Sequence, residues 1–288
     1  MRVVSTDSLQ EGMLLAEDIY AQDKVVLKKG TFLQLPNILF LKNQRSSVGI
    51  YSLEDLDRKF QNNPNTRQLY AVSLMNHIKN LFDSALTSEK DYLQAHQYLV
   101  KLLTDNPDIV SDAYYISYHH GYTLHHSVKV SIYAYMLGKH LGLSLDNLVN
   151  LLIGGIYHDV GKVNISREIL DKPAKLTALE FAEIKKHPLY SANALKTASY
   201  IPDVIVDIAS QHHEKLNGAG YPFGLHSNQI QPLSKIITVS DIFDACTSAR
   251  VYHSARSSKE GFDILDECVR KQEVDDILVQ ALKKVLVK

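Results

Sequence analysis

The chain has 288 residues, which is enough for one large domain or two domains of ordinary size. Its 31 Lys and Arg residues almost balance its 32 Asp and Glu residues, so no net field would draw it onto DNA, RNA or an anionic membrane. A hydrophobic content of 45% with 22% charged residues excludes a largely disordered or fibrous chain. Any charged ligand must therefore be held by a local site.

The amino-terminal residues and the lack of a long apolar run predict a cytoplasmic protein. The first ten residues lack the apolar stretch of a secretory signal, and no window approaches the roughly 18 uninterrupted apolar residues of a membrane span. Two cysteines, Cys246 and Cys268, cannot form a disulfide framework and do not have CxxC spacing. We expect both to be reduced thiols.

The first part of the chain reads as a small, mostly β module. Short β-branched runs alternate with turn signals up to about Tyr51, and they predict strands at Val3-Val4, Ile19-Tyr20, Val25–Leu27 and Val48–Tyr51. From Leu53 the apolar residues change to helical spacing, which predicts two helices leading out of the module. Pro107 marks a boundary, giving a module of residues 1–105 and a domain of residues 106–288.

Beyond that boundary the apolar residues have helical spacing almost throughout, for example in 128–141, 148–156 and 236–242. No alternation of strands and helices appears, so an all-α bundle is favoured over a parallel sheet. The sequence also has no GxGxxG or GxxxxGK loop that would cradle a phosphate. The predicted fold class is mainly α, with the β module in front.

Histidine is concentrated in this second part. The chain has 13 histidines, and eleven lie between His119 and His253. Histidine is the commonest metal ligand and titrates near neutral pH, so the excess points to a metal or acid–base site. Histidines scattered over surface and core are the alternative, and motif spacing must decide between them.

The sharpest motif is His158-Asp159 followed by Gly161-Lys162, at the end of the apolar helix 148–156. It sets an imidazole beside a carboxylate that can bridge two metal ions, with a lysine nearby that can neutralise phosphate charge. Helix capping would explain the same residues equally well.

A second motif begins with His212-His213 and ends with Gly220-Tyr221-Pro222. Consecutive histidines in a regular helix point about 100° apart, so both can face one site only near a helix end. The Gly-rich run that follows supplies that end. Further candidates are His126, His187 and Asp241.

In order and spacing, these motifs resemble the HD-GYP domain, the cyclic di-GMP phosphodiesterase branch of the HD superfamily. The resemblance runs from about Ser117 to Val269, and Lys172-Pro173 and Arg250-Val251-Tyr252 also fit it. The segment 9–31 is similar to the small β module that often precedes such domains. The implied fold is an all-α bundle of the HD type.

The resemblance implies a site for two divalent transition metals with a bridging carboxylate. His126, His158, Asp159 and Asp241 would surround one ion, and Asp159, His187, His212 and His213 would surround the other. Mixed imidazole and carboxylate ligands suit Fe or Mn as the functional ions, and Zn or Ni can bind the same ligands. Two such ions can activate a bridging hydroxide for in-line attack on phosphorus.

The resemblance also implies substrate contacts. Asp159 and Lys162 would be catalytic, with Lys162 stabilising phosphoryl charge, while Gly220, Tyr221 and Arg250 would shape the nucleotide pocket.

Three positions depart from the family pattern. Tyr122 stands where some members carry an acid that helps to hold a third metal, which favours two metals here. Asn217 replaces an aspartate near the pocket, and His253 replaces a phosphate-reaching arginine. Both changes predict weaker ligand binding.

These observations predict a phosphodiesterase that hydrolyses cyclic di-GMP to pGpG and GMP. The alternative is a metal-binding protein of low or no activity that acts as a cyclic di-GMP sensor or scaffold. Hydrolysis of another cyclic dinucleotide or a nucleotide monoester also stays open, since the motifs fix the metal chemistry better than the base pocket. The β module has no ligand constellation, so we expect it to be regulatory or to bind protein partners. The sequence does not indicate an oligomeric state.

Overall fold

The computed structural model describes residues 2–9, 13, 15–21, 24–29, 31, 33, 35–50, 75, 78, 82, 86, 88–105, 110, 126–248 and 257–286. Of the sequence candidates, Tyr122, Arg250, Val251, Tyr252 and His253 lie outside these residues, as does most of the first predicted helix after the β module. By its internal contacts the chain divides into two compact units, Met1–Leu81 with Asp105–Leu124, and Phe82–Thr104 with His125–Lys288.

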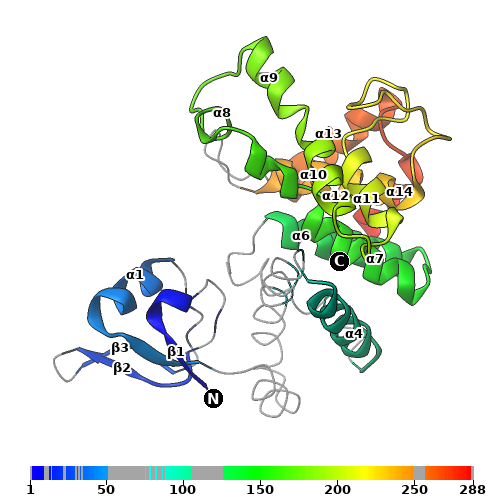
Figure 1. Ribbon diagram of the computed structural model, residues 1–288. Coiled ribbons are helices and arrows are strands. Elements are labelled where there is room, and N and C mark those ends of the chain that lie inside the picture. The colour runs from blue at the N-terminus through cyan, green and yellow to red at the C-terminus, as the bar shows by residue number, and fades with distance from the viewer. Residues whose placement is uncertain are drawn as a thin grey trace. The chain divides into compact units, whose positions relative to one another are not determined.

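The first unit contains two small antiparallel sheets (Figure 1). Strand β1 (Arg2–Ser5) pairs with β4 (Ser47–Ile50), and β2 (Ile19–Ala21) pairs with β3 (Lys24–Leu27), which confirms the four predicted strands. A short 3₁₀ helix, η1 (Thr6–Ser8), follows β1. The core of this unit is a cluster of buried aliphatic residues: Leu9, Leu15, Ile19, Leu33, Ile38, Leu41, Val48 and Ile50.

Helix α1 (Leu35–Gln44) also belongs to the first unit and was not predicted. Its apolar residues are nearly continuous along the chain, and a short continuous run does not distinguish a helix from a strand. Ile38 and Leu41 lie three residues apart and are both buried, so one side of the helix reaches the core. Tertiary packing therefore selected the helix.

The second unit is helical, which confirms the predicted all-α bundle. Its elements in chain order are α4 (Glu89–Asp105), α6 (His126–His140), α7 (Leu145–Tyr157), η2 (Val160–Asn164), α8 (Arg167–Leu170), α9 (Ala178–Ile184), α10 (His187–Lys196), α11 (Asp203–Gln211), α12 (Pro232–Thr247), α13 (Ser258–Arg270) and α14 (Asp276–Leu286). Figure 1 shows α6, α7, α10, α11 and α12 gathered together at the centre of this unit.

Two adjacent glycines let α7 pack closely against its neighbours. A Cβ on Gly155 would lie 2.6 Å from the Cα of Ser131 in α6, and a Cβ on Gly154 would lie 2.6 Å from a methyl group of Ile208 in α11. Any larger residue at Gly155 would force the two backbones apart. Close packing at these glycines therefore fixes the position of the end of α7 against α6 and α11.

Helix α4 belongs to the second unit, although the predicted boundary at residue 105 assigns it to the first domain. The Tyr157 hydroxyl donates a hydrogen bond of 2.5 Å to the Phe82 carbonyl, and the Tyr92 ring lies 5.5 Å from the Tyr200 ring. The Phe82 ring lies 6.0 Å from the Tyr92 ring of α4 and 5.9 Å from the Tyr157 ring of α7, so it links the two helices. A domain boundary at residue 105 stays a prediction.

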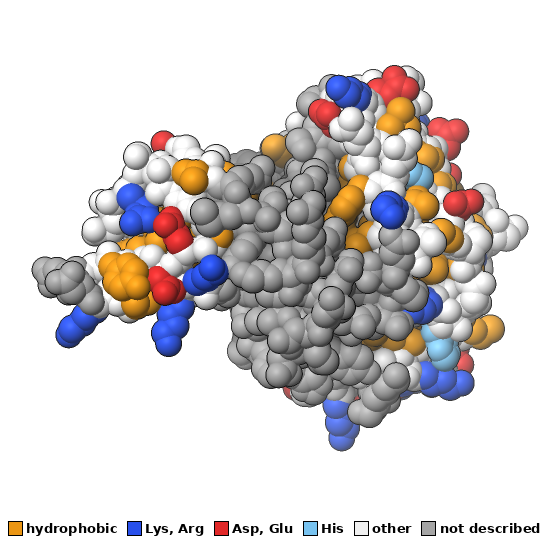
Figure 2. Space-filling view, turned by 90° about the horizontal axis from the view of Figure 1, so that it is seen from below, with side chains coloured by type: hydrophobic (Ala, Val, Ile, Leu, Met, Phe, Trp, Pro, Cys, Tyr) orange, Lys and Arg blue, Asp and Glu red, His pale blue; other side chains and the backbone are white. Residues whose placement is uncertain are grey.

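Acidic and basic side chains are interspersed over the described surface on the face that Figure 2 shows. Among the described residues, no helix is both long enough and apolar enough to span a membrane.

Candidate metal centre

The His158-Asp159 pair lies where α7 ends and η2 begins. His158 is the C-cap residue of α7, and Asp159 is the N-cap residue of η2. The His158 ring is fully buried, and its Nδ1 lies 2.7 Å from the Gly155 carbonyl oxygen. Since a carbonyl can only accept, Nδ1 carries the proton and Nε2 is left with a free lone pair. The helix end thus presents an imidazole ready to bind a metal.

His187 and His212 are prepared in the same way at two other helix ends. His187 opens α10, and its Nδ1 lies 2.7 Å from the Ile184 carbonyl oxygen. His212 is the C-cap residue of α11, and its Nδ1 lies 2.9 Å from the Ala209 carbonyl oxygen. Both rings are buried, and their Nε2 atoms lie 3.3 Å apart. Each bond fixes a ring whose Nε2 can accept a metal.

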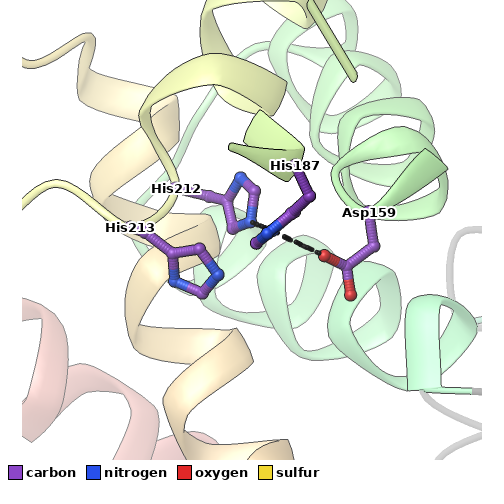
Figure 3. A group of neighbouring side chains, drawn as sticks. All are labelled: Asp159, His187, His212 and His213. Atoms are coloured by element: carbon purple, nitrogen blue, oxygen red, sulfur yellow. Dashed lines mark hydrogen bonds and ion pairs between the residues drawn. The ribbon is translucent and has the colours of Figure 1, made fainter. Parts of the chain in front are cut away.

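The Asp159 carboxylate divides its two oxygens between two sets of histidines. Its Oδ2 lies 3.4 Å from His158 Nε2 and 3.6 Å from His126 Nε2. Its Oδ1 lies 3.1 Å from His187 Nε2 and 3.7 Å from His212 Nε2, and Figure 3 shows this second set converging on the carboxylate. A carboxylate placed in this way can bridge two cations.

The ligand atoms form two groups, each with its members within 4.8 Å of one another. The first ligand group is His126, His158 and Asp159, and the second ligand group is Asp159, His187, His212 and His213. Three buried atoms in them make no hydrogen bond: Nε2 of His126, Nε2 of His158 and Oδ1 of Asp159. Buried polar atoms normally have partners, so these atoms fit a site that metal ions complete.

Asp241 on α12 lies beside the first ligand group. Its Oδ1 is 3.1 Å from His126 Nε2 and 4.0 Å from His158 Nε2. Its other oxygen, Oδ2, is 3.9 Å from His213 Nδ1 in the second ligand group. The structure therefore brings together all seven residues that the sequence assigned to metals: His126, His158, Asp159, His187, His212, His213 and Asp241.

The electrostatics of the site keep both aspartates ionised. Burial raises the pKa of Asp159, but the neighbouring His158 ring, the Lys162 ammonium and the His187 ring lower it well below its usual range. Burial also raises the pKa of Asp241, but His126 and the other nearby histidines lower it well below its usual range. Ionised carboxylates are the form that binds a metal.

Lys162 Nζ lies 2.6 Å from Asp159 Oδ2, so the lysine that was predicted to stabilise phosphoryl charge pairs with the Asp159 carboxylate. The intervening Gly161 has a packing role. A Cβ on it would collide with the Ser191 backbone nitrogen and the His187 carbonyl oxygen, and its own N–H donates to Ser191 Oγ at 2.8 Å. Glycine here lets η2 lie against α10 and brings Asp159 to His187.

Tyr221 lies beside His213, and Gly220 lies against Glu214. The Tyr221 ring centroid is 4.7 Å from that of His213, with the planes tilted by 34°. Burial and the nearby Asp241 and Asp159 charges raise the pKa of Tyr221 above its usual value, so its hydroxyl stays protonated. A Cβ on Gly220 would lie 2.5 Å from the Cα of Glu214, so only glycine permits this loop to fold back on the helix end.

Two residues missed by the sequence analysis support the site. Asp244 Oδ2 lies 2.7 Å from His126 Nδ1, while its Oδ1 accepts from Ser248 Oγ at 2.8 Å. Glu214 is buried and accepts backbone hydrogen bonds from Phe223 and Leu225, which anchors the Tyr221 loop. The spacing of Asp241 and Asp244, one helical turn apart, was a usable signal.

Asn217, a departure from the family pattern, lies on the surface. Its Nδ2 donates to the Lys271 carbonyl oxygen at 2.8 Å, and its Oδ1 accepts from the Ala219 N–H at 3.0 Å. The amide therefore ties the loop to the end of α13. An aspartate could accept the second bond but could not donate the first.

A family model described as HD domain matches residues 106–278, more than half of the chain. The chain belongs to the HD domain family. The fold of the whole chain is similar to that of Bd1817, an HDG"Y"P protein from Bdellovibrio bacteriovorus, with a TM-score of 0.70 and 17% identity, covering 100% of this chain and 99% of that one. The resemblance inferred from the motifs is confirmed.

Two curated relatives are similar to part of this chain. The 3'3'-cGAMP-specific phosphodiesterase 3 of Vibrio cholerae is 34% identical over 165 residues, which are 57% of this chain and 35% of that protein. A cyclic di-GMP phosphodiesterase of Pseudomonas aeruginosa is 37% identical over 139 residues, which are 48% of this chain and 34% of that protein. The chain thus matches about a third of the length of these relatives.

Proposed function

We propose that this chain is a metal-dependent phosphodiesterase that hydrolyses cyclic di-GMP to linear pGpG, and onward to GMP where the second bond is also cut. The observation that carries the proposal is the Asp159 carboxylate, whose two oxygens face separate groups of histidines. That arrangement is the one a two-metal phosphodiester site needs.

In this proposal the first ligand group and Asp241 hold one divalent ion, and the second ligand group holds the other, with Asp159 shared. Fe or Mn are the functional ions, and Zn or Ni bind the same ligands. When bound, the pair supplies an activated water and neutralises charge that builds up on the phosphate. The residues themselves fix the ions: three rings are locked by backbone carbonyls, and the His126 ring is locked by Asp244.

Lys162 and Tyr221 serve the substrate. The Lys162 ammonium stabilises negative charge on the phosphoryl oxygens, because it lies next to Asp159 and is only partly shielded from solvent. Tyr221 offers a protonated hydroxyl and a ring face beside His213, which suits one wall of a nucleotide pocket. Gly220 makes room for the backbone of that wall, and Arg250 adds a cation for phosphate.

The names of the relatives support a cyclic dinucleotide as substrate but do not agree on the base, because one is called cGAMP-specific and the other acts on cyclic di-GMP. A substrate panel is therefore the decisive experiment. Protein loaded with Fe, Mn, Ni or Zn is incubated with cyclic di-GMP, 3'3'-cGAMP, cyclic di-AMP and a nucleotide monoester, and products are separated by chromatography.

We expect cyclic di-GMP to be converted to pGpG, with His212→Ala as the inactive control. Faster cleavage of another member of the panel would reassign the substrate. Binding of cyclic di-GMP with no product under any metal would overturn the enzymatic proposal and support the sensor alternative.

A further inference from the structure

Two adjacent lysines precede His187, and the structure gives them different surroundings. Lys186 Nζ pairs with Glu183 Oε2 at 2.6 Å on the exposed side of the chain. Lys185 Nζ instead lies 5.5 Å from the centroid of the Tyr221 ring and 4.9 Å from that of Phe181. No carboxylate among the described residues lies within ion-pair distance of the Lys185 ammonium. Its charge is therefore available to a ligand.

Lys185 lies near the candidate metal centre, through its closeness in sequence to His187 and its contact with Tyr221. It is the C-cap residue of α9, two residues before His187, and its N–H bonds to the Phe181 carbonyl at 3.0 Å. Tyr221, which its ammonium faces, is also in ring contact with His213. The ammonium thus lies on the rim of the site, on the side where Tyr221 forms the wall.

A cyclic dinucleotide needs more than one cationic contact, because it carries two phosphodiester anions. The ions and Lys162 neutralise the phosphate that is cut, and Lys162 is already engaged with Asp159. The second phosphate would be held outside the metal centre, where an unpaired ammonium stabilises it by a charge-assisted hydrogen bond. Among the described lysines around α9 and α10, Lys172 and Lys186 are paired with glutamates.

Resting on the proposed function, we propose that Lys185 binds the second, uncleaved phosphodiester of a cyclic dinucleotide. Its contacts with the Tyr221 and Phe181 rings hold the long side chain over the site, which reduces the entropy lost when the phosphate binds. Lys185 is then a specificity residue, since it strengthens the binding of substrates with two phosphates but not of those with one.

The test compares Lys185→Met with Lys186→Met in the full, metal-loaded chain. Methionine keeps an apolar side chain of similar length and removes only the charge. We expect Lys185→Met to raise KM and the calorimetric dissociation constant for cyclic di-GMP about tenfold, the loss of one charge-assisted hydrogen bond, with little change in kcat. Lys186→Met should behave as the wild type, and Lys185→Arg should recover most of the affinity.

A one-phosphate substrate, bis(p-nitrophenyl) phosphate, separates phosphate binding from support of the fold. The loss caused by Lys185→Met should be several-fold smaller for this substrate than for cyclic di-GMP. Equal losses on both substrates, or a change in kcat alone, would overturn the inference and make Lys185 a support for Tyr221. A wild type that binds but never cleaves the dinucleotide would overturn the proposed function alone, because the dissociation constants would still test Lys185. No binding by the wild type would overturn both.

Discussion

The two ligand groups differ in how their imidazole rings are held. In the second ligand group, His187 and His212 each donate Nδ1–H to a carbonyl three residues back along the chain. In the first ligand group, His158 does the same, but His126 is oriented by Asp244, which is 118 residues away. The side chain of His126 is also 26% exposed, while that of His212 is fully buried.

The difference teaches that one part of the site is built by local geometry and another by helix packing. A carbonyl three residues back is present wherever the helix end forms. The Asp244 carboxylate reaches His126 only when α12 lies against α6. We therefore expect the first ligand group to be the more easily perturbed of the two.

The largest effect should come from Asp159, which both groups share. Asp159→Ala removes the one negative charge common to the two ions and leaves their repulsion poorly screened, so both metals should be lost. His126→Ala removes one neutral ligand from one ion, so about one metal per chain should remain. Elemental analysis of protein purified without oxygen measures both stoichiometries. The loss of a single metal in each variant would show that Asp159 does not bridge.

Asp244→Asn should lower the metal affinity of the first ligand group only. The amide cannot orient the His126 ring as a carboxylate does, and loss of such a partner typically costs about 10- to 100-fold in metal affinity. Ser248→Ala is the matched control, because it removes one hydrogen bond to Asp244 and leaves the carboxylate in place. Metal titration of each variant gives the affinities. If Asp244→Asn lowered the affinity for both ions, this would contradict the view that local carbonyls hold the second ligand group while helix packing holds His126.

Acid should also act mainly on the first ligand group. Burial lowers the pKa of His126, but the nearby carboxylates of Asp241, Asp244 and Asp159 raise it to about 9. Burial lowers the pKa of His213 to about 4. At pH 7 the metal-free protein therefore holds a proton on His126 that a metal must displace, while His213 is already neutral.

Metal affinity at the first ligand group should accordingly rise about tenfold per pH unit from pH 6.5 and level off near pH 9. Affinity at the second ligand group should depend little on the His213 proton over that range. By the same linkage, the raised pKa of His126 stabilises the metal-free fold below pH 6.5, and that stability is lost toward pH 9. Calorimetric titrations in buffers of different ionisation enthalpy count the protons released. Equal pH slopes for the two ions would contradict this difference.

The smallest expected effect lies away from both groups. Asn217→Asp loses the hydrogen bond to the Lys271 carbonyl and should destabilise the fold by about 1 kcal/mol. Thermal unfolding of the variant and the wild type measures this loss in the free energy of unfolding. A gain in turnover without loss of stability would instead support the view that this position weakens ligand binding.

Much of the site could be predicted because its residues occur in short motifs. His158-Asp159 and His212-His213 stand at helix ends that the apolar spacing and the following glycines already indicated. The roles of Asp244 and Glu214 could not be read in the same way. An aspartate on α12 or a glutamate after a histidine pair acquires a partner only when a distant helix or loop packs against it.

The sequence by itself determined the all-α class of the second unit and the β strands of the first, since the spacing of apolar residues is a local property, and the resemblance of its motifs to a known family supplied the seven candidate ligands. Only the tertiary structure decided that α4 packs with the second unit, that the Asp159 oxygens face two different groups of histidines, and that the Lys185 ammonium lies over the Tyr221 ring while Lys186 pairs with Glu183. Those outcomes depend on how closely α6, η2, α10 and α12 approach one another. That approach is set by glycines such as Gly155 and Gly161, whose missing side chains matter only once the neighbouring backbone is in place.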